Sequence, residues 1–231
     1  MKPTASARAL FRATGHKTKS VNIRSGSDLG GDFEITNGLE RESADFYPTP
    51  PDPTRALIAT EGTRLREFSK LWEPAAGDGA MVRLLEDSGH RVHASDLIDR
   101  GCGAEIRSFY DFTIPPTQAI VTNPPYQECN WRDGRGRWIY HALDTLNVEY
   151  MALLLSWSWP GAGGHAVLWA AHPPARVYLM RWKIDFIGQG APPMLNAWFV
   201  WDRSWSGETV LRMMDKIDNR QGEINFGEAK S

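Results

Sequence analysis

A short strand, a tight turn and the start of a helix are encoded by the stretch Leu71-Trp72-Glu73-Pro74-Ala75-Ala76-Gly77-Asp78-Gly79. Its first two residues suit a buried strand, and residues 79–88 carry the apolar stripe of a helix that ends at a glycine. Gly77 and Gly79 allow the backbone to turn tightly and to approach a ligand closely. The two acidic side chains make this turn a poor cradle for phosphate. The stretch therefore argues against a dinucleotide-binding fingerprint and favours a cationic ligand.

The rest of the chain alternates between strand-like and helix-like segments. Further helices are expected at 52–68, with Asp52 as N-cap, and at 139–146 and 162–171. The order predicts a single-domain, doubly wound α/β sheet that is mostly parallel, with a late strand antiparallel at or near an edge. Apolar runs predict the other strands at 91–96, 118–122, 150–156, 176–180 and 195–201, and one more is expected between 104 and 108.

Composition sets the class of protein. The chain has 231 residues, 42% of them hydrophobic and 23% charged, which is typical of one globular domain with a large core. It has no apolar run long enough for a membrane span and no secretory h-region, so a cytoplasmic protein is expected. Cys102 and Cys129 have no Cys or His at metal-ligand spacing, so no metal site is expected. A basic segment precedes Asp28 and suits either a solvated tail or an arm that tracks phosphates.

A second informative segment is Asn123-Pro124-Pro125-Tyr126, which closes the apolar run 119–121 and so lies at a strand end. An exocyclic amine on a base is a poor nucleophile, because its lone pair is delocalised into the ring. The carboxamide oxygen of Asn123 and the backbone carbonyl of Pro124 can accept its two protons. Tyr126 offers a flat face for the base. The segment therefore predicts methyl transfer to an amine by an in-line displacement, which needs positioning more than a strong base.

Acidic residues follow two other segments. Asp96 lies about twenty residues after the glycine turn, where a carboxylate can accept from two ribose hydroxyls, with Leu97 beside it. A helix N-cap is the alternative role of Asp96. Asp111 can accept from the amino group of an adenine while Phe112 packs on the ring, although both also fit an ordinary loop. S-adenosylmethionine, which carries a sulfonium, an ammonium and an adenosine, matches this set.

Arginine, glycine and tryptophan are interleaved at 131–138, directly after the tetrapeptide. This composition suits a loop that meets a phosphate backbone, and a plain surface loop is the alternative. Most of the ten tryptophans lie in apolar segments and are expected in the core. The candidates for nucleic-acid contact are Trp131, Arg132, Arg135, Arg137, Trp182 and Phe186, with Trp138 as a further one.

The chain resembles the S-adenosylmethionine-dependent amino-methyltransferases of DNA, especially small adenine-specific enzymes of phages and prophages. The resemblance rests on 46–51, 73–79, Asp96, 111–112 and 123–126, extends loosely to 197–202 and covers most of residues 45–202. It implies a Rossmann-like class I methyltransferase fold, S-adenosylmethionine as cofactor and the N6 amine of adenine in DNA as target. It also assigns the methionine part of the cofactor to Tyr47, Thr49 and Pro50. The expected cofactor-binding residues are thus Tyr47, Thr49, Pro50, Glu73, Ala75, Gly77, Asp78, Gly79, Asp96, Leu97, Asp111 and Phe112, and the expected catalytic residues are Asn123, Pro124, Pro125 and Tyr126.

The cofactor motifs precede the catalytic one, as in the gamma arrangement of such enzymes. The expected division is a basic arm at 1–44, a catalytic domain at 45–210 and a polar tail at 211–231. About thirty residues follow Trp201, too few for a recognition domain. A short or relaxed recognition sequence is therefore expected, on duplex DNA with a flipped adenine or on single strands.

Several other substrates fit the same tetrapeptide. A glutamine side-chain amide in a protein poses the same lone-pair problem, and adenine in RNA or the exocyclic amine of cytosine is chemically similar. A nucleic-acid-binding protein that kept the fold without turnover is a further alternative. The sequence ranks adenine in DNA first on the resemblance alone.

Overall fold

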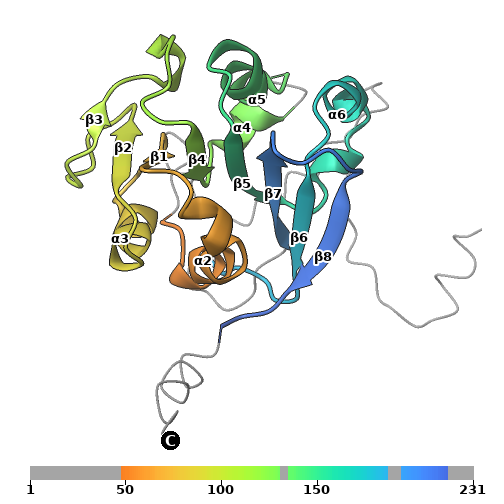
Figure 1. The fold of residues 1–231 in the computed structure, drawn as a ribbon, viewed down its shortest axis with the longest axis horizontal. Helices are drawn as coiled ribbons and strands as arrows, with labels where there is room; N and C mark the ends of the chain where they lie inside the picture. The colour runs from red at the N-terminus through yellow and green to blue at the C-terminus, as the bar shows by residue number, and fades with distance from the viewer. Residues whose placement is uncertain (1–47, 131–134, 187–193, 218–231) are drawn as a thin grey trace, which may run out of the picture. The chain divides into compact units, whose positions relative to one another are not determined.

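A mixed sheet of eight strands organises the chain in the computed structural model, which describes residues 48–130, 135–186 and 194–217 (Figure 1). The strands lie in the order β3-β2-β1-β4-β5-β7-β6-β8. β7 runs antiparallel to both of its neighbours, and the other neighbouring pairs are parallel. This confirms the expected fold class. The strands are β1 (Leu71–Glu73), β2 (Val92–Asp96), β3 (Glu105–Ile106), β4 (Ala119–Thr122), β5 (Tyr150–Ser156), β6 (Arg176–Met180), β7 (Asn196–Asp202) and β8 (Val210–Met214).

The direction of winding reverses between β1 and β4. β2 and β3 extend the sheet on one side of this junction, and β5 with the later strands extends it on the other. Trp72 pairs with Ile120 across the junction. In open sheets of this kind, ligands bind in the crevice outside the carboxyl ends of the strands at such a switch point. Residues 73–79 and 123–126, which follow β1 and β4, both lie there.

Helices cover both faces of the sheet. α2 (Pro51–Leu65) and α3 (Ala80–Asp87) pack on one face, and α4 (Tyr126–Cys129), α5 (Arg137–Tyr140) and α6 (Ala166–Ala171) pack on the other. Consecutive residues of β5 alternate between two apolar clusters, with Met151 and Leu153 in one and Ala152 and Leu154 in the other. β5 is buried on both sides, which is why its sequence is a continuous apolar run.

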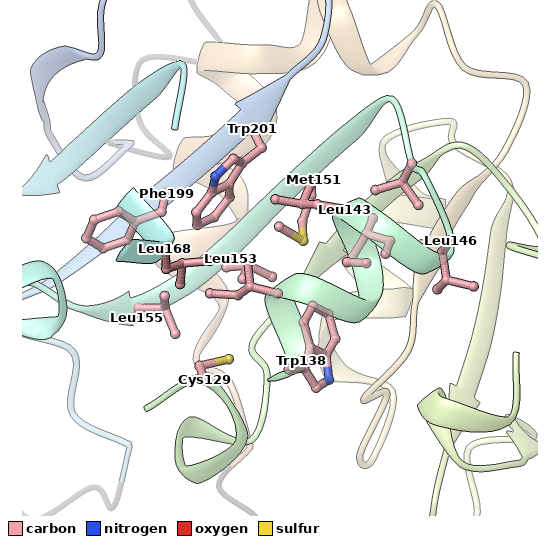
Figure 2. Close-up of a cluster of buried hydrophobic side chains, with 14 of the residues drawn as sticks. Cys129, Trp138, Leu143, Leu146, Met151, Leu153, Leu155, Leu168, Phe199 and Trp201 are labelled. Carbon is pink, nitrogen blue, oxygen red and sulfur yellow. The ribbon is translucent and has the colours of Figure 1, made fainter. Parts of the chain in front are cut away.

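Figure 2 shows the first of these clusters. Trp138 and Leu143, from the helical segment that starts with α5, point toward Met151 and Leu153 of β5. Full burial of a side chain of this size contributes roughly 1.5–3 kcal/mol. This packing fixes α5, and with it the short α4, against the part of the sheet that carries the site.

The late strands are placed more centrally than the sequence indicated. β7 is antiparallel as expected, but it lies between β5 and β6, third from the edge, and every one of its residues is buried. The sheet also continues past residue 210, because β8 pairs with β6 and reaches Met214. The expected boundary of the polar tail at 211 therefore falls inside this strand.

Three helices differ from their expected limits. α2 starts at Pro51, so Asp52 lies in its first turn rather than at the N-cap, and it ends at Leu65 rather than at residue 68. The helix expected at 139–146 begins at Arg137 and continues as a π-helical segment. The one expected at 162–171 is a 3₁₀ turn followed by the short α6.

The expected arm at 1–44 lies outside the described residues. No helix in the described part of the chain is long and apolar enough to cross a membrane. The same residues contain no group of three or more side chains suited to hold a metal ion.

Candidate active site

The carboxyl ends of β1 and β4 are joined directly by side chains. Glu73, the last residue of β1, accepts a hydrogen bond at Oε1 from the hydroxyl of Thr122, the last residue of β4. The same oxygen accepts from the backbone N–H of Ala75 at 3.2 Å. Thr122 was not among the expected site residues, and only the pairing of the two strands identifies it.

The second oxygen of Glu73 is the unusual one. Glu73 is 1% exposed, and Oε2 is buried without a hydrogen-bond partner among the described residues. Burial raises the pKa of the Glu73 carboxyl well above its ordinary value, against the opposing effect of the Thr122 hydrogen bond. A buried acceptor without a donor is costly unless something else supplies the donor.

The glycine turn after β1 is closed by its neighbours. Gly77 and Gly79 have φ values of 58° and 78°, in the left-handed region that favours glycine. Asp96, at the end of β2, accepts at Oδ2 from the N–H of Gly77 at 2.8 Å and at Oδ1 from that of Ile98 at 2.9 Å. Asp96 is therefore not a helix N-cap. It fixes the turn, and the exposed Leu97 follows it.

Two further contacts shape this turn. Cys102 donates from Sγ to the carbonyl of Gly77 at 3.3 Å, and a Cβ built on Gly79 would lie 2.9 Å from the Cβ of Cys102. Asp78 accepts at Oδ1 from the N–H of Ala80 at 3.0 Å, so a carboxylate already occupies the N-terminus of α3. A carboxylate at this position disfavours a phosphate there.

The tetrapeptide lies beside this turn, directly after β4. Asn123 donates from Nδ2 to the hydroxyl of Thr49 at 3.0 Å, which brings together two segments that lie 74 residues apart in the chain. Oδ1 of Asn123 is buried without a hydrogen-bond partner in the described chain. Pro124 is buried, and Pro125 and Tyr126 are half-buried at the start of α4.

Tyr126 contacts β7, the antiparallel strand. Its hydroxyl accepts from Nδ2 of Asn196, the first residue of β7, at 3.2 Å. Trp198 on the same strand donates from Nε1 to the carbonyl of Pro53 at 2.9 Å, which fixes the start of α2. Sequence reasoning missed Asn196, since a polar residue at a strand end gives no signal without the fold.

The residues expected to meet adenine are differently placed. Phe112 is 3% exposed and lies edge-on to Trp72, with 4.8 Å between the ring centroids, so its ring is part of the core. The guanidinium of Arg107 lies 3.9 Å from the centroid of the Phe112 ring. Asp111 is exposed, and its carbonyl accepts from Arg107 at 2.8 Å.

The candidates for nucleic-acid contact that follow α4 differ in exposure. Arg137 pairs with Glu128 through two nitrogens and lies over the ring of Tyr110, while Arg135 is exposed with a φ of 51°. Trp138 was wrongly expected at the surface, since it is 1% exposed and stacks on Phe109 at 4.1 Å between centroids.

Trp182 and Phe186 are half-buried and pack against the cluster on the α2 face. Tyr47, Trp131 and Arg132 lie outside the described residues.

No protein-family model and no curated protein sequence matches this chain. Solved structures do match it in fold. A candidate class I S-adenosylmethionine-dependent methyltransferase from Listeria monocytogenes aligns with a TM-score of 0.50 and 11% identity, over 71% of this chain and 65% of that one. A candidate RNA methyltransferase from Pyrococcus horikoshii aligns with a TM-score of 0.51 and 12% identity, over 68% of this chain and 86% of that one. The likeness, the strand order and the antiparallel β7 together show that the chain has the Rossmann-like fold of class I methyltransferases.

Proposed function

We propose that the protein transfers a methyl group from S-adenosylmethionine to the N6 amine of adenine in DNA. The observation that carries the proposal is the hydrogen bonding of the Asn123 carboxamide. Its Nδ2 is engaged by Thr49, and its Oδ1 is buried without a donor among the described residues. The exocyclic amine of a base is a donor of the kind that this oxygen lacks.

The residues beside Asn123 fit the cofactor. The buried Oε2 of Glu73 is an acceptor that suits an ammonium group, and Asp78 keeps phosphate away from α3. Asp96 holds the turn in place, and Leu97, 68% exposed, offers an apolar surface next to it. When bound, S-adenosylmethionine would supply an electrophilic methyl group on a sulfonium.

The chain itself would position the amine. Asn123 accepts one of its protons, a backbone carbonyl such as that of Pro124 accepts the other, and the ring of Tyr126 supports the base. A neutral amine that is held with its lone pair toward the methyl group can attack before it loses a proton. The proton can therefore leave the amine after the methyl group arrives, without a dedicated strong base.

The preference for DNA rests on the family resemblance and on Arg135. This arginine is exposed, and the N–H of the next residue, Gly136, donates to the carbonyl of Asn130 at 3.1 Å, just after the helix that Tyr126 begins. An arginine here suits a phosphate next to a flipped adenine. We place the enzyme in the cytoplasm of a bacterial or phage-infected cell and expect relaxed specificity from the short loops.

Transfer of labelled methyl groups tests the proposal. The protein is incubated with labelled S-adenosylmethionine and unmethylated duplex DNA, single-stranded DNA, RNA or a glutamine-containing peptide, and the products are identified by nucleoside mass spectrometry or peptide mass. We expect N6-methyladenine in DNA. Methylation of RNA or peptide alone would reject the DNA target, methylcytosine would reject adenine, and cofactor binding without any transfer would indicate an idle binding protein.

Two variants locate the site. Asn123→Ala should lower transfer by about a hundredfold or more, the usual effect of removing a group that stabilises developing charge, without loss of cofactor affinity. Gln118→Ala is the matched control, since this exposed carboxamide lies just before β4, at the opposite end of the same strand. Full activity of Asn123→Ala would reject the site.

A further inference from the structure

Asn196 is a fully buried polar residue that the proposed chemistry does not use. It is 0% exposed and pairs with Ser156, the last residue of β5. Because β7 is antiparallel, its first residue lies at the carboxyl ends of the parallel strands. The side chain of Asn196 thus reaches Tyr126, which lies 70 residues earlier in the sequence.

The orientation of its carboxamide is fixed. Nδ2 of Asn196 lies 3.4 Å from the carbonyl of Leu155 and 3.2 Å from the hydroxyl of Tyr126. A backbone carbonyl can only accept, so the NH2 group must face both partners. Each of its two hydrogens then has one acceptor, and Oδ1 points elsewhere.

Oδ1 of Asn196 is buried and has no hydrogen-bond partner among the described residues. A leucine of similar size would avoid this cost, so folding does not by itself explain an asparagine here. The contact with Tyr126 does explain it. Tyr126 begins α4, a helix of four residues, which is too short to hold a side chain rigidly by its own hydrogen bonds.

We propose that Asn196 is a positioning residue that holds Tyr126 through its hydroxyl and so fixes the ring that supports the target base. This rests on the proposed function. Asn123 and Tyr126 would then each be anchored by a distant segment, the first by Thr49 and the second by Asn196. Loss of the anchor should slow transfer, because the base would be held in more than one orientation.

A double-mutant cycle tests the proposal. Asn196→Leu and Tyr126→Phe both remove the hydrogen bond between the two side chains. Asn196→Leu also removes the one to the Leu155 carbonyl, whereas Tyr126→Phe loses only a hydroxyl. Each should lower kcat about tenfold, the effect of one buried hydrogen bond expressed in the transition state, with cofactor Kd unchanged. Because both substitutions act through one contact, the kcat of the double variant should lie within about twofold of that of the slower single variant.

The control is Trp201→Phe, which removes the 2.8 Å hydrogen bond from Nε1 to the carbonyl of His172 at the other end of β7. It should lower the free energy of unfolding, because it removes a buried hydrogen bond, and leave kcat unchanged. The proposal is overturned if Tyr126→Phe keeps full kcat, or if the double variant shows the product of the two single effects.

A second readout does not depend on activity. The four proteins of the cycle are unfolded in denaturant, and their free energies of unfolding should be non-additive if Asn196 and Tyr126 are linked. Absence of transfer by the wild-type protein on DNA would reject the proposed function alone. Additive unfolding free energies would reject the link between Asn196 and Tyr126, whatever the substrate.

Discussion

Replacing Glu73 with glutamine should stabilise the protein and weaken its binding of S-adenosylmethionine. Glutamine keeps a carbonyl oxygen for the Thr122 hydroxyl and the Ala75 N–H, the two donors that Oε1 of Glu73 accepts from. It cannot carry the charge that the burial of Glu73 disfavours. Because the ammonium of the cofactor is cationic, the same change removes its expected partner.

The size of the effect depends on pH, because burial raises the pKa of Glu73 well above the ordinary value of 4.5. From about pH 4.5 upward, the unfolded chain has released a proton that the native protein still holds. The free energy of unfolding then falls by up to about 1.4 kcal/mol per pH unit until the pH passes the folded pKa. This contribution is fully present below pH 4.5 and is lost as the pH rises, so Glu73→Gln should gain its advantage at neutral pH and none at pH 4.

Denaturant unfolding of both proteins between pH 4 and pH 8 measures the difference in slope. Titration calorimetry with the cofactor, in two buffers of different ionisation enthalpy, measures proton release. The wild-type protein should release a proton as the cation binds and lowers the pKa of Glu73, and Glu73→Gln should release none from this position. Equal slopes of the free energy of unfolding against pH in the two proteins would refute a buried protonated carboxyl at position 73. Equal affinity for the cofactor with equal proton release would show that Glu73 does not contact the cofactor.

A matched control is Glu61→Gln. Glu61 is also buried, at 5% exposure, but its Oε1 pairs with Arg176 Nε at 2.8 Å. The same substitution there should lower the free energy of unfolding at pH 7, because it weakens the compensation of a half-buried guanidinium. If Glu73→Gln raises the free energy of unfolding at pH 7 and Glu61→Gln lowers it, then position 73 is distinguished by its unfilled acceptor and not by burial of a glutamate alone.

Other positions give equally direct tests. Thr49→Ala should lower kcat for transfer about tenfold, since it releases Asn123 Nδ2, and Thr49→Ser should retain it. Gly79→Ala should lower the free energy of unfolding by about 1–2 kcal/mol because of its φ of 78°. It should lower it further because the new Cβ would lie 2.9 Å from the Cβ of Cys102. Adding Cys102→Gly should recover the part due to this clash, whereas adding Cys102→Ala, which keeps the Cβ, should not. Despite its burial, the hydrogen bonds that Asp202 accepts from arginines lower its pKa from 3.8 to about 2, so this carboxylate stabilises the fold above pH 3.8 and the stability is lost as the pH falls toward 2. Asparagine cannot titrate, so in acid unfolding Asp202→Asn should remove about 2–3 kcal/mol of that pH-dependent loss of stability.

The sequence predicted the parts of the fold that are encoded locally. The apolar run of β5 and the glycine turn after β1 carry their own signals, and both are where they were expected. β8 has no such signal, because its Leu211 and Met213 are exposed and it is a strand only through its pairing with β6. The central position of β7 was likewise inaccessible, since strand order is decided by tertiary pairing rather than by the sequence of one strand.

The structure brings the glycine turn and the tetrapeptide to the same end of the sheet, but the contacts between them were not predicted. The tetrapeptide was recognisable from its chemistry, whereas Thr49 and Asn196 reach it from 74 and 70 residues away. Trp138 shows the opposite error. Its charged neighbours suggested exposure, but on α5 the adjacent Arg137 faces outward while Trp138 faces the core.

The two ends of the central strands differ in how completely their polar groups are satisfied. At the amino ends, Arg176 donates to Glu61 and Asp202, and Tyr150 and Tyr178 donate to Glu61. This network holds β5, β6 and β7 to α2 and leaves little for a ligand to add.

At the carboxyl ends, three buried oxygens have no donor among the described residues, namely Glu73 Oε2, Asn123 Oδ1 and Asn196 Oδ1. All three are acceptors once Glu73 is ionised, so a ligand that completes this end must bring hydrogen-bond donors or positive charge. An ammonium and an exocyclic amine supply both, whereas a phosphate would add more acceptors to a site that already lacks donors. The unsatisfied groups thus select the chemistry of the ligands, and the cost that they impose on folding is the reason why filling or neutralising them should raise stability and lower activity together.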